Sequence, residues 1–420
     1  MGTKFVYVLW FIVLCDPQWW IASFGPTFVR HIPTFLFGIT LLLLPLQAPS
    51  AWFPPLLTFI LYTCVNSFAF AYNRGLSFVV VKLLVAYYVL AIGSLAFVRK
   101  ARQAVPIVAG VLLWQFVWWV VLGVKNGIVS WHPSLNNYDG YGPLMSIGIG
   151  TTYYYGMSTS NRRERWLAFA VSGGCVVGLV SSYARGAVLA GAAVFCWIWL
   201  RSKRKGLATL VVVGGVVVVG LTGSFLSGSD RGDADSDFFT EMSTIGSGDG
   251  SQNDRSVIWA LARKEFYENP VFGVGADGFG PYAAGNFGVG SVGGAYDDNP
   301  GTLYGKALHS VYFQILAEYG AVGSAIFVWM VVDFFLRNAA LRQRPRIDRW
   351  ALVSGGRLHL EQLSYALEVG MVGFLAGGLF YNLIFGVHWF YSLLTINTLL
   401  SYLSDPAASP GRLATARARR

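Results

Sequence analysis

Apolar runs long enough to cross a lipid bilayer recur along almost the whole chain. A helix of about 17–25 apolar residues spans the hydrocarbon core of a membrane, and short polar connections separate the runs here. The pattern predicts about twelve transmembrane helices. Their approximate limits are 5–20, 32–47, 52–72, 78–98, 105–124, 141–157, 166–183, 186–200, 207–226, 309–336, 366–384 and 387–403.

Composition supports the same fold class. Of the 420 residues, 55% are hydrophobic and only 12% are charged, whereas soluble domains carry about 25% charged residues. The mean hydropathy is +0.52. We therefore expect an all-α polytopic membrane protein. The first apolar run continues into Asp16 and Pro17 without a small-residue cleavage site, so it is predicted to be a span and not a signal peptide.

One long polar connection divides the chain. Residues 1–226 are predicted to form nine transmembrane helices, 227–308 an extracytoplasmic loop, 309–403 three more helices, and 404–420 a basic tail. The start of the loop is rich in Gly, Ser and Asp, which predicts a mobile segment. Residues 254–268 show a helical apolar stripe, and Pro270 follows the end of that helix.

Charge distribution orients the predicted helices. Basic clusters fall in alternate connections, such as those at 99–102, 162–165 and 201–205, and in the tail. Cytoplasmic connections carry this excess of Lys and Arg. Both termini are therefore predicted to be cytoplasmic, and the long loop lies on the opposite side. The net charge of +10 follows this membrane pattern, so we expect no nucleic-acid partner.

Two arginines and a histidine are predicted to share the extracytoplasmic side. Arg185 lies in a short turn between two apolar runs, where a cation needs a partner or a water-filled cavity. The alternative is a side chain that snorkels to the interface. Arg255 opens the loop helix, and His309 precedes a span. Alone, Arg255 would be a surface residue and His309 a structural histidine.

Other motifs have simpler interpretations. Residues 273–278 match G-x-G-x-x-G, but a helix precedes them, so the pattern favours a close backbone approach over nucleotide binding. The acidic residues between 230 and 249 do not fit an EF-hand, and the four cysteines have no zinc or disulfide spacing. Glu318 is an ionisable residue within a span, which usually has a role; Lys82 is a candidate partner.

Three segments resemble the superfamily of O-antigen ligases and O-antigen polymerases, which are bacterial cell-envelope glycosyltransferases. They are Ser181 to Ala187, Arg255 to Trp259 with the following Asn269 to Gly275, and His309 to Gly320. The similarity in order, spacing and layout covers most of the chain from about residue 141 onward. One departure is Ser310, where the family commonly has Asn.

The resemblance implies a GT-C-like fold and a function. It implies an O-antigen ligase of the bacterial inner membrane with its active site facing the periplasm. The donor would be an undecaprenyl-pyrophosphate-linked glycan and the acceptor the lipid A–core oligosaccharide. His309, Arg185 and Arg255 would be the catalytic residues, supported by Glu318, Gly273, Gly275 and Tyr312. No cofactor and no metal are expected.

The residue types suit this chemistry. Guanidinium groups stay charged and match phosphate oxygens with a planar fork, so Arg185 and Arg255 could hold the pyrophosphate. An imidazole, whose ordinary pKa is about 6.5, could remove the acceptor's proton, or His309 could only position a phosphate or hydroxyl. Direct displacement would invert the anomeric carbon. A polysaccharide polymerase, a protein O-glycosylating ligase and a transporter remain alternatives.

Overall fold

The computed structural model describes residues 2–15, 54–125, 138–202 except 183, a few residues between 205 and 214, 250–287, 300–343, 354–382, 384 and 388–404. Within these residues the fold is all-helical, and an isolated bridge joins Thr159 to Leu358. The helices are α1 (Gly2–Cys15), α4 (Pro54–Ala69), α5 (Arg74–Phe97), α6 (Ala101–Ala109), η3 (Gly110–Trp114), α7 (Gln115–Lys125), α8 (Tyr138–Ser158), α9 (Arg162–Ser181), α10 (Arg185–Arg201), α13 (Gly250–Glu268), α14 (Phe279–Asn286), η6 (Pro300–Gly305), α15 (Val311–Gln343), α17 (Leu360–Gly377) and α19 (Trp389–Ser404).

Among the residues that the structure describes, four helical segments are long and apolar enough to cross a membrane. They are α5, the continuous stretch Ala101–Val121, α9 and α15. Shorter apolar helices are Gly2–Leu14, Pro54–Ala69 and Gly186–Arg201. The all-helical membrane fold class is therefore confirmed, whereas the count of twelve spans stays a prediction. The expected span at 32–47 and most of the one at 207–226 lie outside the described residues, as does the acidic segment 230–249.

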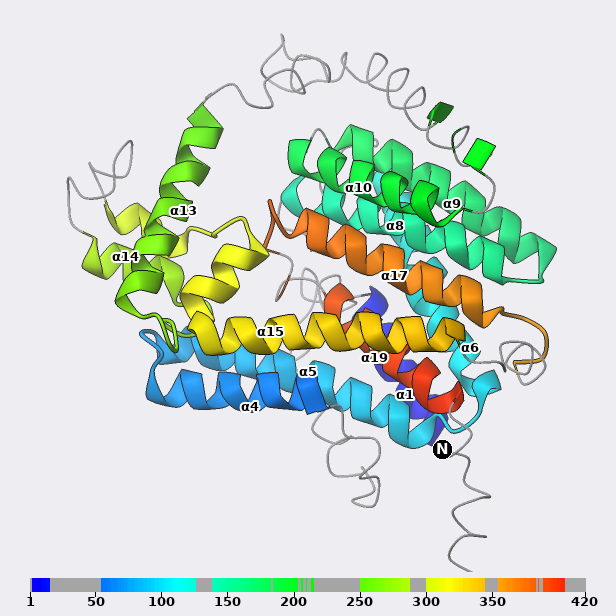
Figure 1. Ribbon diagram of the computed structural model, residues 1–420, viewed down its shortest axis with the longest axis horizontal. Coiled ribbons are helices and arrows are strands. Elements are labelled where there is room, and N and C mark those ends of the chain that lie inside the picture. The colour runs from blue at the N-terminus through cyan, green and yellow to red at the C-terminus, as the bar shows by residue number, and fades with distance from the viewer. Residues whose placement is uncertain are drawn as a thin grey trace, which may run out of the picture.

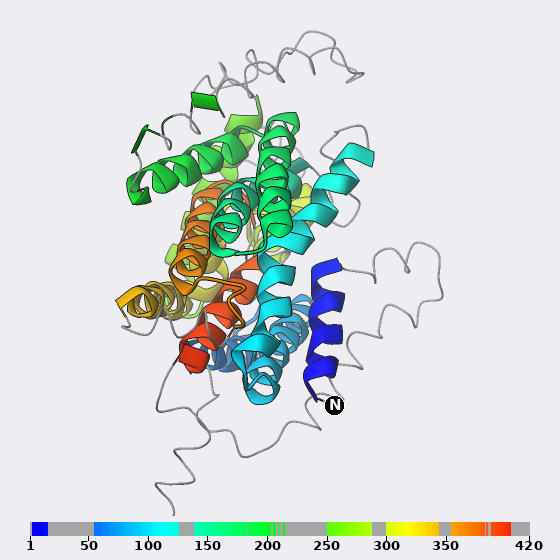
Figure 2. The same ribbon diagram turned by 90° about the vertical axis from the view of Figure 1, so that its right-hand side faces the viewer.

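The described residues form two separate hydrophobic cores. The larger one runs through the helical bundle from α1 to α19. The smaller one joins α13, α14 and η6 to the first turns of α15 through Ile258, Leu261, Phe279, Leu303 and Ala317, among others. Figure 1 shows α13 and α14 at one end of the bundle, beside the ends of α4 and α5, and Figure 2 shows α1 lying along α6. The long loop therefore contributes a small helical lobe of its own.

A break in α15 joins the lobe to the bundle. Gly320 has φ 63 and ψ −162, so the helix bends there, and the part before the break runs at a steep angle to the rest (Figure 1). The turn from Pro270 to Gly275 fills the break. The amides of Ala321 and Val322 donate to the carbonyls of Pro270 and Val271 at 2.8 and 3.2 Å.

The same turn also satisfies the carbonyls on the other side of the break. The amides of Val274 and Gly275 donate to the carbonyls of Ala317 and Glu318 at 3.2 and 2.9 Å. Backbone groups that leave a helical ladder need new partners when they are buried. The turn and the broken helix supply these partners to each other, and we call this arrangement the interlock of residues 270–275 with 317–322.

An ion triad ties three helices together at the other end of the bundle. The buried carboxylate of Glu368 on α17 binds Arg201 at the end of α10 and Arg342 near the end of α15. Arg342 also donates to the hydroxyl of Ser364 at 3.2 Å. The triad therefore ties the far ends of α10 and α15 to α17, and the beginnings of α10 and α15 both lie beside the residues that follow α17.

Candidate functional site

His309 lies in an unusual backbone conformation between the two cores. Its φ is 49, in the left-handed region, which costs a non-glycine residue about 1–3 kcal/mol. Leu308, before it, belongs to the smaller core, and Val311, after it, belongs to the larger one. The side chain is partly exposed. The histidine therefore marks the junction between the lobe and the bundle.

Hydrogen bonds hold the peptide groups on both sides of His309. The indole N–H of Trp259 donates to the carbonyl of Leu308 at 2.9 Å, and the amide of Ser310 donates to Oδ1 of Asn382 at 3.0 Å. A net gain of about 0.5–1.5 kcal/mol for each bond is similar in size to the cost of the left-handed backbone. We call Trp259 and Asn382 the His309 clamp.

Arg255 comes from the same helix as Trp259. The two residues are four positions apart on α13 and therefore lie on neighbouring turns of one face. The Trp259 ring stacks on Phe313 of α15, with centroids 5.1 Å apart and an interplanar angle of 23°. This packing directs the first turns of α13 toward the segment that holds His309. The side chain of Arg255 is partly buried.

Arg185 is the first residue of α10. Its neighbour Gly186 lies against the turn after α17, because a Cβ at this glycine would come within 2.5 Å of Phe380 Cβ. The N-cap of α10 is Ala184, which makes no side-chain capping bond. The amides of an uncapped helix start and the positive end of the helix dipole both attract anions. The backbone amides at the start of α10, beside Arg185, therefore favour the binding of an anion.

The turn after α17 connects the candidate residues. Gly378 accepts a hydrogen bond from the amide of Val311 at 2.7 Å, Phe380 touches Gly186, and Asn382 holds Ser310. The structure thus brings the backbones of Arg185 and His309 to one turn, and Trp259 links α13 to the same place. From the sequence, Trp259 was named only as the end of a motif and was given no role, and Asn382 was not named. The available signal for Asn382 was a lone amide within an apolar run.

Three of the four expected supporting residues lie at the interlock, away from His309 along α15. Gly273 approaches α15 so closely that a Cβ would lie 2.4 Å from the carbonyl carbon of Glu318. Gly275 bonds the carbonyl of Glu318. The Glu318 carboxylate accepts from Gln314 Nε2 at 3.3 Å and from the amides of Asp277 and Phe279. The expected close backbone approach is therefore to α15 at Gly273, whereas a Cβ at Gly275 would meet the Cβ of Ala71 at 2.4 Å.

The fourth supporting residue and the suggested partner of Glu318 lie elsewhere. Tyr312 donates its hydroxyl hydrogen to the carbonyl of Leu375 at 2.8 Å, which attaches α15 to α17. Lys82 is exposed, and its ammonium lies 5.5 Å from the centroid of the Phe78 ring. Among the described residues, Glu318 and Lys82 form no ion pair. The carboxyl group of Glu318 instead lies at the start of α14, where it accepts hydrogen bonds from the amides of Asp277 and Phe279.

A buried carboxyl on α13 was not expected from the sequence. Glu265 has no exposed surface, and neither of its carboxyl oxygens has a hydrogen-bond partner in the part of the chain that is described. Burial, followed by the charges of Glu318 and Glu268, raises its pKa well above the ordinary value. Burial also raises the pKa of Asp277. The interface between α13 and α15 therefore favours a protonated Glu265.

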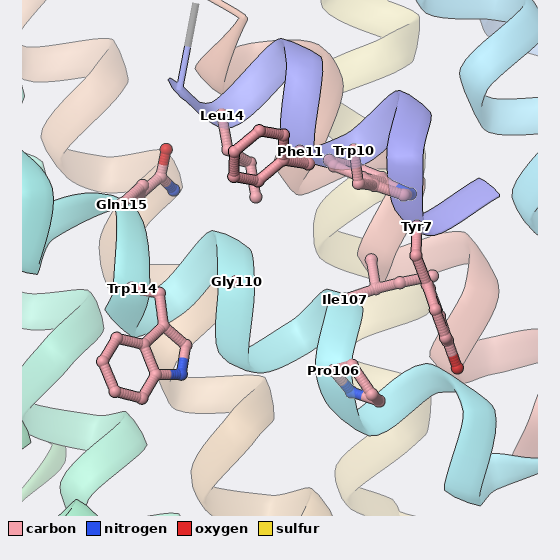
Figure 3. Close-up of a pocket in the computed structure, with 9 residues that line it drawn as sticks. All are labelled: Tyr7, Trp10, Phe11, Leu14, Pro106, Ile107, Gly110, Trp114 and Gln115. Carbon is pink, nitrogen blue, oxygen red and sulfur yellow. The ribbon is translucent and has the colours of Figure 1, made fainter. Parts of the chain in front are cut away.

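Two further features bear on the candidate residues, namely the arrangement of possible metal ligands and an apolar cavity. Within the described ranges, no group of three or more His, Cys, Asp or Glu side chains is arranged to hold a metal ion. A cavity of about 240 Å³ lies between α1 and the stretch of α6, η3 and α7 (Figure 3). Trp10, Phe11, Pro106 and Trp114 line it with other residues, and none of the expected site residues does.

Comparison with known proteins supports the resemblance seen in the sequence. The family model described as O-antigen ligase matches residues 167–328, which include Arg185, Arg255 and His309. The resemblance to the superfamily of O-antigen ligases is therefore confirmed. The chain is similar to membrane glycosyltransferases of the ligase and polymerase type, and this family implies lipid-linked glycan substrates. No curated protein matches the chain.

Proposed function

We propose that this protein is an O-antigen ligase of the bacterial inner membrane. It transfers a glycan from undecaprenyl pyrophosphate to the lipid A–core oligosaccharide on the periplasmic face, with both of its own termini in the cytoplasm. The observation that carries the proposal is the approach of the Arg185 and His309 backbones to one turn, within the region that matches the family model. The bond from Trp259 to Leu308 supports the inclusion of Arg255.

The two arginines hold the pyrophosphate in this mechanism. The start of α10 offers uncapped backbone amides beside Arg185, and Arg255 approaches from α13. As the bond between the anomeric carbon and the phosphate oxygen breaks, the electron pair passes to the pyrophosphate. A well-placed donor that stabilises this growing charge contributes about 3–4 kcal/mol. Polyprenyl pyrophosphate then leaves as the second product.

His309 acts on the acceptor. Its imidazole removes the proton from an acceptor hydroxyl while that oxygen forms a bond to the anomeric carbon. The proton ends on the imidazole and the glycan on the acceptor, so atoms and charges balance. Attack opposite the leaving pyrophosphate inverts the configuration of the anomeric carbon. Because the base and the arginines serve different substrates, their substitutions have separable effects.

The test compares donor binding with transfer. The purified protein in lipid nanodiscs is given lipid-pyrophosphate-linked glycan and lipid A–core, and binding and single-turnover transfer are measured. Arg185→Lys and Arg255→Lys keep the charge but lose the planar fork, so both should weaken donor binding and transfer. His309→Ala should nearly abolish transfer, with a small residual rate, and leave donor binding nearly intact. Arg263→Lys changes an exposed arginine on the same helix and serves as the control.

The results also separate the alternatives. If His309→Ala weakens donor binding as much as the arginine substitutions do, His309 belongs to the phosphate site and is not the base. A gene deletion distinguishes the acceptors in cells. Loss of all O-chain with accumulation of full-length lipid-linked polymer supports a ligase. Survival of one repeat unit on the core indicates a polymerase, and unchanged lipopolysaccharide contradicts both.

A further inference from the structure

The two residues of the His309 clamp come from different parts of the fold. Trp259 belongs to α13 in the lobe, and Asn382 follows α17 in the bundle. Each binds a peptide group adjacent to the His309 α-carbon: the carbonyl of Leu308 at 2.9 Å and the amide of Ser310 at 3.0 Å. These two peptide groups define both backbone torsions of His309. Holding them therefore fixes the direction in which the imidazole leaves the chain.

The clamp holds His309 in a backbone conformation that a histidine disfavours. A histidine with φ 49 lies in a region that few non-glycine residues adopt. Without partners on both sides, His309 would relax toward a negative φ, and its Cβ would point in another direction. The Val311 amide bonds Gly378 at 2.7 Å and fixes the following helix start, so relaxation would fall mainly on His309 itself.

We infer that Trp259 and Asn382 are positioning residues that aim the His309 imidazole at the acceptor hydroxyl, in the transfer reaction proposed above. Neither needs to touch a substrate for this role. A displacement of about 1 Å of a reacting group can cost about 100-fold in rate. The clamp therefore acts on the turnover step through His309 and leaves the hold on the donor pyrophosphate unchanged.

The variants remove one hydrogen bond each and keep most of the packing. Trp259→Phe keeps an aromatic ring to stack on Phe313 but has no N–H for Leu308. Asn382→Leu keeps the size and loses the acceptor for Ser310, whereas Asn382→Asp keeps an acceptor oxygen. We expect roughly 10- to 100-fold lower kcat for the first two with the donor KM nearly unchanged, and partial rescue with Asn382→Asp.

Two matched controls account for general loss of stability. Trp389→Phe shortens a buried tryptophan whose indole N–H has no acceptor in the described part of the chain. Asn397→Leu removes a buried amide that bonds the carbonyl of Phe334 at 2.8 Å on α15. Both changes resemble the clamp variants in size and chemistry. Each should leave kcat within about twofold of the wild type when the protein is folded.

A double substitution tests whether the clamp works through His309. In the His309→Ala background, Trp259→Phe should lower the residual transfer rate no further, because the imidazole that it positions is absent. An equal loss of rate in both backgrounds would overturn the role, and so would an unchanged kcat in Trp259→Phe and Asn382→Leu. A loss of the same size in the Trp389→Phe control would also overturn it.

Hydrogen exchange gives a readout that does not depend on transfer. The Ser310 amide should exchange slowly in the wild type and in Asn382→Asp, and at least about 10-fold faster in Asn382→Leu. Fast exchange in the wild type would contradict the clamp. If the wild-type protein moves no glycan, the proposed function fails, and the exchange data alone decide whether the backbone of His309 is held.

Discussion

Replacing Gly273 by alanine should release the interlock of residues 270–275 with 317–322. Gly273 has φ +68, and an added Cβ would lie 2.4 Å from the carbonyl carbon of Glu318 and 2.5 Å from the carbonyl oxygen of Ala317. A left-handed backbone costs an alanine about 1–2 kcal/mol. Forcing an extra methyl group into a packed backbone costs about 1–3 kcal/mol more. The Gly273→Ala substitution should therefore cost about 2–5 kcal/mol in total.

Two other glycines separate these contributions. Gly356 has φ +71 with no atom within 4 Å of an added Cβ, so Gly356→Ala should show only the backbone cost of about 1–2 kcal/mol. Gly173 lies within α9 and is equally open. Gly173→Ala should be neutral or slightly stabilising, because alanine favours a helix over glycine by about 1 kcal/mol.

The assay is amide hydrogen exchange in detergent micelles, with the thermal midpoint as a global measure. The amides of Ala321 and Val322 donate to the turn, so their exchange reports on opening of the interlock. A cost of at least 2 kcal/mol corresponds to roughly 30-fold faster exchange or more. If Gly273→Ala is no more destabilising than Gly356→Ala, the close approach is not the reason for glycine at this position, and the argument fails.

Three further predictions concern titration, ion pairing and metal. Because native Glu265 stays protonated at a pH where the unfolded chain ionises, wild-type stability should fall above about pH 4.3 by up to ~1.4 kcal/mol per pH unit. Glu265→Gln should remove that part of the slope in thermal unfolding between pH 5 and 8, and parallel slopes would refute the assignment. Glu368→Gln should lower the thermal midpoint because it leaves Arg201 and Arg342 without their carboxylate. The cost should stay below the ~3–5 kcal/mol of a fully buried pair, since Arg201 is 39% exposed. Glycan transfer should persist in excess EDTA, and activity that is lost and then restored by magnesium would show that the arginines do not hold the pyrophosphate alone.

The interlock shows why the sequence could suggest a close approach but not its partner. The glycines at 273 and 275 indicated a backbone that comes near another group. Only the tertiary structure identifies that group as the broken part of α15 for Gly273 and as Ala71 for Gly275. The break at Gly320 depends on bonds between segments about 50 residues apart. Local helix periodicity continues across Gly320 and does not reveal a bend that distant carbonyls and amides stabilise.

The sequence alone determined the all-helical membrane class, the helix at residues 254–268 and the resemblance that singled out Arg185, Arg255 and His309. These follow from local periodicity, hydropathy and short motifs, which each segment carries by itself. The tertiary structure decided how the backbone of His309 is held, through Trp259 and Asn382, and where Glu265 is buried. Such contacts depend on how helices far apart in the chain pack together, and neither periodicity nor hydropathy encodes that packing.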